Sequence, residues 1–218
     1  MRLLLALFLA AVPAQARKSS HAPRKPAKAV KAAPAARLEP SRWFASRPGL
    51  LRVYQGHGGA ANAESDEPPP GASCEVLESK PRDSLAAGSL KESCTMIVQR
   101  QARPATELTY ELRQDGIFNV EAKPAGGKAV QFERLVLPGP IKVGAAWKEP
   151  RGNGELDRSV KTAGGACRAA GRSFADCLVL AVTQKEGKKV VRKYTETYAA
   201  GVGLVEDAQW ELVDVKGL

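Results

Sequence analysis

The sequence predicts a mainly β protein: an antiparallel curved sheet, half-barrel or sandwich of about ten strands, with at most one or two short helices. From residue 43 onward, short runs rich in Val, Ile, Thr, Tyr and Phe alternate with clusters of Gly, Pro, Asn and Asp. No stretch repeats its apolar residues with the 3.6-residue period of a helix for more than two turns. Both observations favour a hydrophobic core formed by β-strands and not by helices.

The expected strands follow one another along the chain and end at turn residues. The clearest turn is Asp115-Gly116, a dipeptide that suits a tight hairpin between two strands. Residues 82–92 are the one expected short helix. The ten expected strands are 50–55, 73–77, 93–100, 107–113, 117–122, 130–137, 156–162, 177–184, 189–198 and 204–215.

The N-terminus resembles an export signal. Residues 1–16 combine the basic Arg2, a short apolar core and the small residues Ala14 and Ala16 at the cleavage site. The apolar core is too short to span a bilayer, and the mature chain contains no transmembrane segment. The sequence therefore predicts a signal peptide and an exported bacterial protein, periplasmic or extracellular.

The positive charge of the chain is concentrated in one segment. Residues 17–42 contain eight Lys or Arg residues, one acidic residue and almost no large apolar side chain, so we expect a disordered basic Ala/Pro/Lys linker. The linker either contacts an anionic envelope surface or is a solvated spacer. Residues 43–218 are nearly balanced in charge, with 24 basic and 22 acidic residues, and predict a single β domain with no nucleic-acid partner.

Four cysteines agree with an exported chain. They are even in number and form no C-x-x-C pair, which favours disulfides over a redox motif. We favour Cys74–Cys94 and Cys167–Cys177, because each pair closes a short loop between two expected strands, although three pairings are open in principle. Two histidines without paired ligand spacing predict no metal site.

The segment Gly201-Val202-Gly203 raises the question of a nucleotide-binding loop. A dinucleotide fingerprint needs a third glycine where this chain has Glu206, and it needs a helix where this chain has a strand-like run. We therefore expect no cofactor. The alternative is a hairpin in which Gly201 takes the positive φ of a type II turn and Gly203 permits close backbone approach.

No catalytic constellation is evident. His57 lies in a G-H-G-G run, but the chain has no G-x-S-x-G elbow and no other histidine outside the basic segment. The acidic pairs at 66–67, 155/157 and 206–207 adjoin turns, where carboxylates are common, so a carboxylate-based hydrolase is the weakest alternative.

The two faces of the expected strand 189–198 differ from those of a membrane strand. Alternate residues from 190 to 198 mix Val, Arg, Tyr and Glu, whereas a lipid-facing surface is uniformly apolar. Such a face fits a curved sheet with a partly lined cavity. Trp147, Tyr198 and Trp210 are candidate ligand-lining residues on different strands.

Three stretches carry a resemblance to a known group of proteins. They are LPGPIKVGAAW at 137–147, AGRSFADCL at 170–178 and YAAGVGLV at 198–205. In this order they resemble a group of poorly characterised exported bacterial β-proteins. The resemblance implies an envelope location and an open antiparallel sheet, and no activity or catalytic residue. Ala200 departs from the group, where proline is common, and would loosen the turn slightly.

The sequence thus favours an exported, disulfide-bonded, non-enzymatic β-domain with a structural or interaction role in the bacterial cell envelope. The alternative is a carrier or sensor of an apolar, lipid-like ligand in a cavity of the sheet. An apolar concavity would favour the carrier, whereas a filled core would disfavour it.

Overall fold

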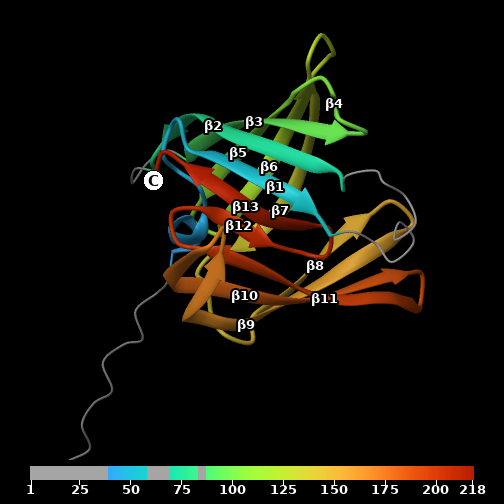
Figure 1. Cartoon of the computed structure of the whole chain (residues 1–218). Helices are drawn as coiled ribbons and strands as arrows, with labels where there is room; N and C mark the ends of the chain where they lie inside the picture. Colours follow the sequence, from blue (N-terminus) through green and yellow to red (C-terminus); the bar gives the residue numbers. More distant parts are fainter. Residues whose placement is uncertain (1–38, 58–68, 83–86) are drawn as a thin grey trace, which may run out of the picture. The chain divides into compact units, whose positions relative to one another are not determined.

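A computed structural model describes residues 39–57, 69–82 and 87–218 (Figure 1). The predicted signal peptide and most of the predicted basic linker lie outside these residues. The linker was predicted to extend to residue 42, whereas Pro40–Trp43 form a 3-10 helix, η1, in which Pro40 and Trp43 are buried. The ordered part of the chain therefore begins slightly earlier than expected.

The prediction of a mainly β protein with an antiparallel curved sheet is confirmed, but the sheet has 13 strands rather than ten. In chain order the strands are β1 (Leu51–Gly56), β2 (Gly71–Lys80), β3 (Gly88–Val98), β4 (Gln101–Ala102), β5 (Thr106–Arg113), β6 (Gly116–Pro124), β7 (Val130–Pro138), β8 (Ala146–Arg151), β9 (Gly154–Ala169), β10 (Arg172–Glu186), β11 (Lys189–Ala199), β12 (Gly203–Glu206) and β13 (Trp210–Lys216).

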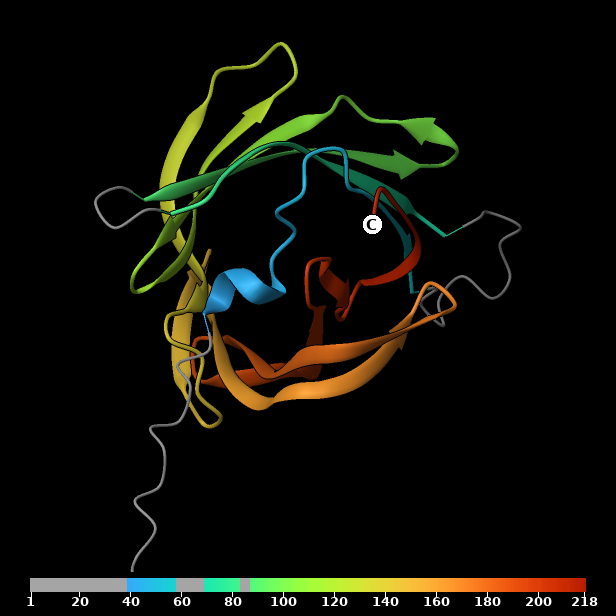
Figure 2. The same ribbon diagram turned by 90° about the vertical axis from the view of Figure 1, so that its left-hand side faces the viewer.

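These strands form one sheet that curls into a nearly closed, barrel-like ring (Figure 2). The order is β7-β6-β5-β3-β2-β1-β13-β12-β11-β10-β9-β8, with β4 paired to β3 at the side. Strand β1 pairs with β13, so the first and last strands are neighbours. Strands β7 and β8 are the two ends of the sheet; they touch, but within the described residues no backbone ladder joins them.

Several local expectations differ from the structure. The expected strand 93–100 ends at Val98, because Gln99 and Arg100 form a turn that leads into the unexpected short strand β4. The expected helix at 82–92 is wrong for residues 88–92, which begin β3 and alternate in burial, while 83–86 lie outside the described residues. The expected strand 204–215 is divided because the Asp207 side chain accepts backbone N–H groups at a bend between β12 and β13. Strand β8 was not expected, because Pro150 argues against a strand except at a sheet edge, which is where β8 lies.

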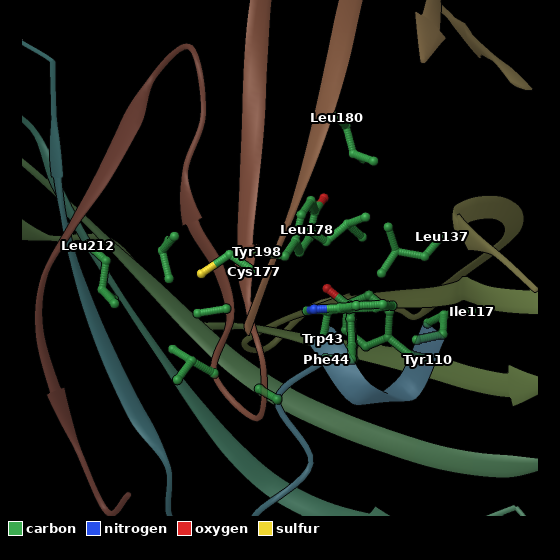
Figure 3. Packing of buried hydrophobic residues seen from close by; sticks show 14 of the residues in the cluster. Trp43, Phe44, Tyr110, Ile117, Leu137, Cys177, Leu178, Leu180, Tyr198 and Leu212 are labelled. Carbon is green, nitrogen blue, oxygen red and sulfur yellow. The ribbon is translucent and has the colours of Figure 1, made fainter. Parts of the chain in front are cut away.

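The chain segment before β1 contributes to the core. Figure 2 shows η1 inside the ring of strands, and Figure 3 shows Trp43 and Phe44 beside Tyr110 and Ile117. Trp43 is fully buried, its Nε1 donates to Asp176 Oδ1 at 3.2 Å, and the Phe44 and Tyr110 rings meet edge to face at 4.9 Å. This segment therefore fills part of the interior and leaves the remainder to side chains of the strands.

Both disulfides predicted from the sequence are present. Cys74–Cys94 joins β2 and β3 at directly opposed positions, and Cys167–Cys177 joins β9 and β10. They close loops with sequence separations of 20 and 10 residues, so the loop-entropy model gives each about 3 kcal/mol of stabilisation. In the described part of the chain, no helix is long and apolar enough to cross a membrane.

Candidate functional site

The alternation of side chains along β11 places charged residues inside the ring. Tyr198 and Glu196 lie opposite the buried Leu178 and Leu180 of β10, so this face of β11 points inward. It is the mixed face that the sequence shows between 190 and 198. A first cavity of about 220 Å³ lies against it, and charged and polar side chains dominate its lining: Arg134, Val136, Glu149, Arg151, Arg158, Gln184, Arg192, Tyr194, Glu196, Tyr198, Leu204, Asp207, Ala208 and Gln209.

Arg158 is the central residue of the first cavity. Its Nη2 donates to Glu196 Oε1 at 2.9 Å, its Nε donates to Glu196 Oε2 at 3.1 Å, and its Nη1 donates to Glu149. The Tyr198 hydroxyl adds a hydrogen bond to Glu196 Oε2 at 3.2 Å. Burial lowers the pKa of Arg158, but the hydrogen bonds and charges of Glu196 and Glu149 outweigh it and raise the net pKa. Arg158 is therefore a charged bridge between β8, β9 and β11.

Three further arginines line this cavity and are exposed, so they form its solvent-facing part, the opening: Arg134, Arg151 and Arg192. Arg134 Nε lies 3.7 Å from Glu149 Oε1 across the junction of β7 and β8, beyond hydrogen-bonding distance. Arg192 donates to the Ala208 carbonyl at 2.8 Å and lies over the Tyr194 ring, 5.7 Å from its centroid. In the stretches that the structure describes, neither Arg151 nor Arg192 forms an ion pair.

A second cavity, of about 240 Å³, has an aromatic and apolar lining with a buried ion pair: Phe44, Arg52, Tyr54, Ala72, Cys74, Glu92, Cys94, Leu108, Tyr110, Arg134, Val136, Tyr198, Leu204 and Trp210. Arg52 of β1 donates through Nη2 to Glu92 of β3. Its Nε is buried and has no hydrogen-bond partner among the described residues. Burial raises the pKa of Glu92, and the Arg52 guanidinium offsets part of this increase.

The two cavities adjoin, because they share four lining residues: Arg134, Val136, Tyr198 and Leu204. Each is smaller than the roughly 300–1,000 Å³ typical of small-molecule sites, but the adjoining pair reaches that range. Together they give the interior one charged end and one aromatic end.

All four tyrosines of the chain line one or both cavities. Burial raises the pKa of Tyr54 to about 12, with partial opposition from Arg52. Burial also raises the pKa values of Tyr110 and Tyr198 well above the usual value, and that of Tyr194 as well. Their hydroxyl groups are therefore neutral donors at physiological pH.

The candidate ligand-lining residues lie in two places. Tyr198 and Trp210 both line the second cavity. Trp147 lies on β8 opposite Arg158 of β9 and lines a separate shallow depression with Ala146 and Lys148. Its Nε1 is buried without a hydrogen-bond partner in the described stretches.

The glycine hairpin lies next to the second cavity. Gly201 has φ +72°, and the Val202 N–H donates to the Ala199 carbonyl at 3.0 Å, which is the geometry of the turn. Gly203 has φ +92°, and a Cβ at this position would lie 2.9 Å from Arg52 Nη1. The missing side chain therefore makes room for the buried Arg52.

The sequence did not single out most of the charged interior residues. Arg52, Glu92, Glu149 and Arg158 lie on four different strands, and no spacing along the chain links them. The available signal was their register: Arg52, Glu92 and Arg158 each occupy an inward position whose neighbouring inward residues on the same strand are apolar or aromatic. A charged residue at such a position needs a buried partner.

Four carboxylates of β8, β9 and β11 are engaged in ion pairs. Glu149 and Glu196 both accept hydrogen bonds from Arg158, while Glu155 and Asp157 pair with the outward Lys148 and Lys185 of neighbouring strands. No group of three or more His, Cys, Asp or Glu residues suited to a metal ion occurs in the described residues. The interior presents guanidinium, hydroxyl and aromatic groups to its two cavities.

The fold and the site together describe a β protein whose nearly closed antiparallel sheet surrounds two adjoining cavities, one with a charged lining and one with an aromatic lining. No family model matches the sequence, and no curated protein matches it. Among solved structures, the chain is similar to a Bacteroides fragilis protein with a YmcC-like fold, at 10% identity and a TM-score of 0.46. The match covers 80% of this chain and 98% of that chain. A similarity this distant carries no argument about function.

Proposed function

We propose that the chain is an exported, non-enzymatic domain of the bacterial cell envelope that works by binding a small ligand inside its sheet. The supporting observation is the composition of the interior. A closed barrel of about eight strands has an interior just wide enough for its side chains to fill, whereas larger barrels enclose ligand cavities or channels. Here the interior contains two adjoining cavities, lined by all four tyrosines and by nine charged residues, five of which form two buried ion-pair clusters.

Export is supported by two independent features. Residues 1–16 have the composition of a signal peptide, and the described domain contains two disulfides and no free cysteine. Disulfides persist in the oxidising compartments outside the cytoplasm. A non-enzymatic role is supported by the engagement of the three carboxylates that line the first cavity. Arg158 binds Glu149 and Glu196, and Asp207 accepts backbone N–H groups.

The ligand of this proposal differs from a purely apolar one. Phe44, Leu108 and the Cys74–Cys94 disulfide can contact an apolar group in the second cavity, but Arg151 and Arg192 surround the opening of the first. A uniformly apolar molecule would cover these guanidinium groups without offering them an acceptor, at a free-energy cost. A mixed lining favours a ligand with polar and apolar parts.

Native mass spectrometry of the protein purified gently from a bacterial periplasm tests this proposal. We expect a non-covalent small-molecule adduct on the wild-type chain. Ala72→Trp places a large side chain in the second cavity and should abolish the adduct. Ala102→Trp, on the exposed strand β4, is the matched control and should retain it.

Circular dichroism and thermal melting establish that each variant folds, and Ala72→Leu replaces Ala72→Trp if the larger side chain prevents folding. The absence of any adduct on the wild-type chain, or equal loading of the wild type and the folded cavity variant, would contradict binding in the interior.

A further inference from the structure

The acidic groups of the first cavity already have partners within the protein. Glu149 and Glu196 accept hydrogen bonds from Arg158. Asp207 Oδ1 accepts the backbone N–H groups of Gln209 at 2.6 Å and Trp210 at 2.8 Å. The acids of the cavity are therefore directed at the protein and not at its opening.

The remaining arginines are in the opposite situation. Arg134 is near Glu149 without a hydrogen bond, and Arg151 and Arg192 form no ion pair within the described residues. Arg192 is fixed in place by the Ala208 carbonyl and the Tyr194 ring, which leaves its other N–H groups available. A guanidinium presents a planar fork of donors that matches a carboxylate or a phosphate. The opening of the first cavity therefore presents guanidinium donors that have no hydrogen-bonded acid among the described residues.

The second cavity contributes an independent observation. Arg52 is 5% exposed and lines the cavity, and its buried Nε has no acceptor among the described residues. A buried donor without an acceptor is destabilising, so the described groups of the protein do not complete the lining of this cavity. Around this donor the walls are apolar and aromatic, with Phe44, Leu108 and Trp210 among them.

We infer that the interior binds an anionic amphiphile, a molecule with one carboxylate or phosphate group joined to an apolar part. The anionic group lies between Arg134, Arg151 and Arg192, and the apolar part enters the second cavity past Arg134 and Tyr198, which line both cavities. The inference rests on the proposed function and adds the chemical class of the ligand. Free fatty acids and phosphate-headed lipids share this chemistry.

Three probes with the same alkyl chain separate the contributions of the head group and the chain. Octanoate, octyl phosphate and octanol are titrated below their aggregation limits at low ionic strength, with intrinsic tryptophan fluorescence, to which Trp210 of the second cavity contributes, as the readout. We expect at least one anion to bind about tenfold or more tightly than octanol. Tighter binding of octanoate indicates a fatty-acid ligand, and tighter binding of octyl phosphate indicates a phosphate head group.

Substitutions at the opening test the position of the anion. Arg151→Gln and Arg192→Gln should each weaken binding of the preferred anion about tenfold and leave octanol binding unchanged. Lys193→Gln, which removes a neighbouring cation from the outward face of β11, is the matched control and should leave both unchanged. Raising the salt concentration should weaken anion binding to the wild type and have a smaller effect on octanol.

The outcomes distinguish this inference from the proposed function. Equal affinity for octanol and both anions, or full retention of anion binding in Arg151→Gln and Arg192→Gln, overturns the anionic class while leaving the interior a binding site. Failure of all three probes together with an adduct in native mass spectrometry overturns the anionic-amphiphile class alone. Failure of both experiments overturns both.

Discussion

Two buried arginines, one in each cavity, are arranged in different ways. Arg52 pairs with a single carboxylate, Glu92, and keeps one buried N–H without an acceptor in the described residues. Arg158 is bracketed by Glu149 and Glu196 and uses three of its N–H groups. Their side chains are similarly buried, with 7% and 11% exposed. The comparison shows that Arg158 mainly joins strands, whereas Arg52 still has a donor to offer.

The surroundings of the two arginines explain this difference. Arg52 lies against Gly203, where a side chain would contact its Nη1, so its position depends on backbone that approaches closely. Arg158 lies between Glu149 of β8 and Glu196 of β11. Its position depends on these two carboxylates. One guanidinium is accommodated by the absence of a side chain, and the other by an excess of acceptors.

Removing the single acid beside Arg52 should have the largest effect. Glu92→Leu leaves a buried guanidinium without a counter-charge, and we expect a loss of about 3–5 kcal/mol in the free energy of unfolding. Urea denaturation at neutral pH measures it. The double variant Arg52→Met/Glu92→Leu is the control and should recover most of the stability, because no uncompensated charge remains. A loss below about 1 kcal/mol in the single variant would contradict a buried, mutually dependent pair.

Removing one of the two acids beside Arg158 should cost less. In Glu196→Gln the guanidinium keeps Glu149, and we expect a loss of about 1–3 kcal/mol from weakened hydrogen bonds. The same denaturation measurement applies, with the exposed Glu206→Gln of β12 as a control near zero. A cost equal to that of Glu92→Leu would show that Glu149 does not compensate, and the contrast between the two arginines would disappear.

The tyrosines around the two arginines should leave the free energy of unfolding independent of pH near neutrality and make it fall with rising pH above about pH 10. Because burial raises their pKa values, the folded chain keeps neutral hydroxyls where the unfolded chain ionises. The stability that they contribute is fully present below about pH 10, the ordinary tyrosine value, and is lost as pH rises towards about 12, the pKa of Tyr54. Ultraviolet absorbance should show Tyr194, the least buried, ionising first. A tyrosinate signal from Tyr54 near pH 10 in folded protein would contradict this description.

The sequence predicted the fold class because turns and alternation are local signals. Asp115-Gly116 and the run from 189 to 198 specify strands without information from the rest of the chain. The prediction of a helix at 88–92 was wrong because this segment becomes a strand through its pairing with β2 and β5. Those partners are distant in the sequence, so no local pattern indicates the pairing. Strand β8, which also was not predicted, lies at an edge of the sheet, where Pro150, which has no N–H to donate, is tolerated.

The candidate site was less predictable than the fold. Tyr198 and Trp210 were singled out as aromatic residues, and the mixed face of β11 was visible in the alternation. The Arg52–Glu92 pair depends on the registers of β1 with β2 and of β2 with β3, which no spacing in the sequence encodes. The opening with Arg134 and Arg151 depends on the meeting of the two ends of the sheet.

The pairing of β1 with β13 has a consequence for how the chain reaches its folded state. The ring cannot form until the last strand has emerged, because the first strand has its partner there. Such non-local pairing makes folding slow and leaves strand edges open for longer. The two disulfides join strands that are close in sequence, β2 with β3 and β9 with β10, so each can form before the ring closes. An oxidising compartment would therefore stabilise the β2–β3 and β9–β10 parts of the sheet before the ring is complete.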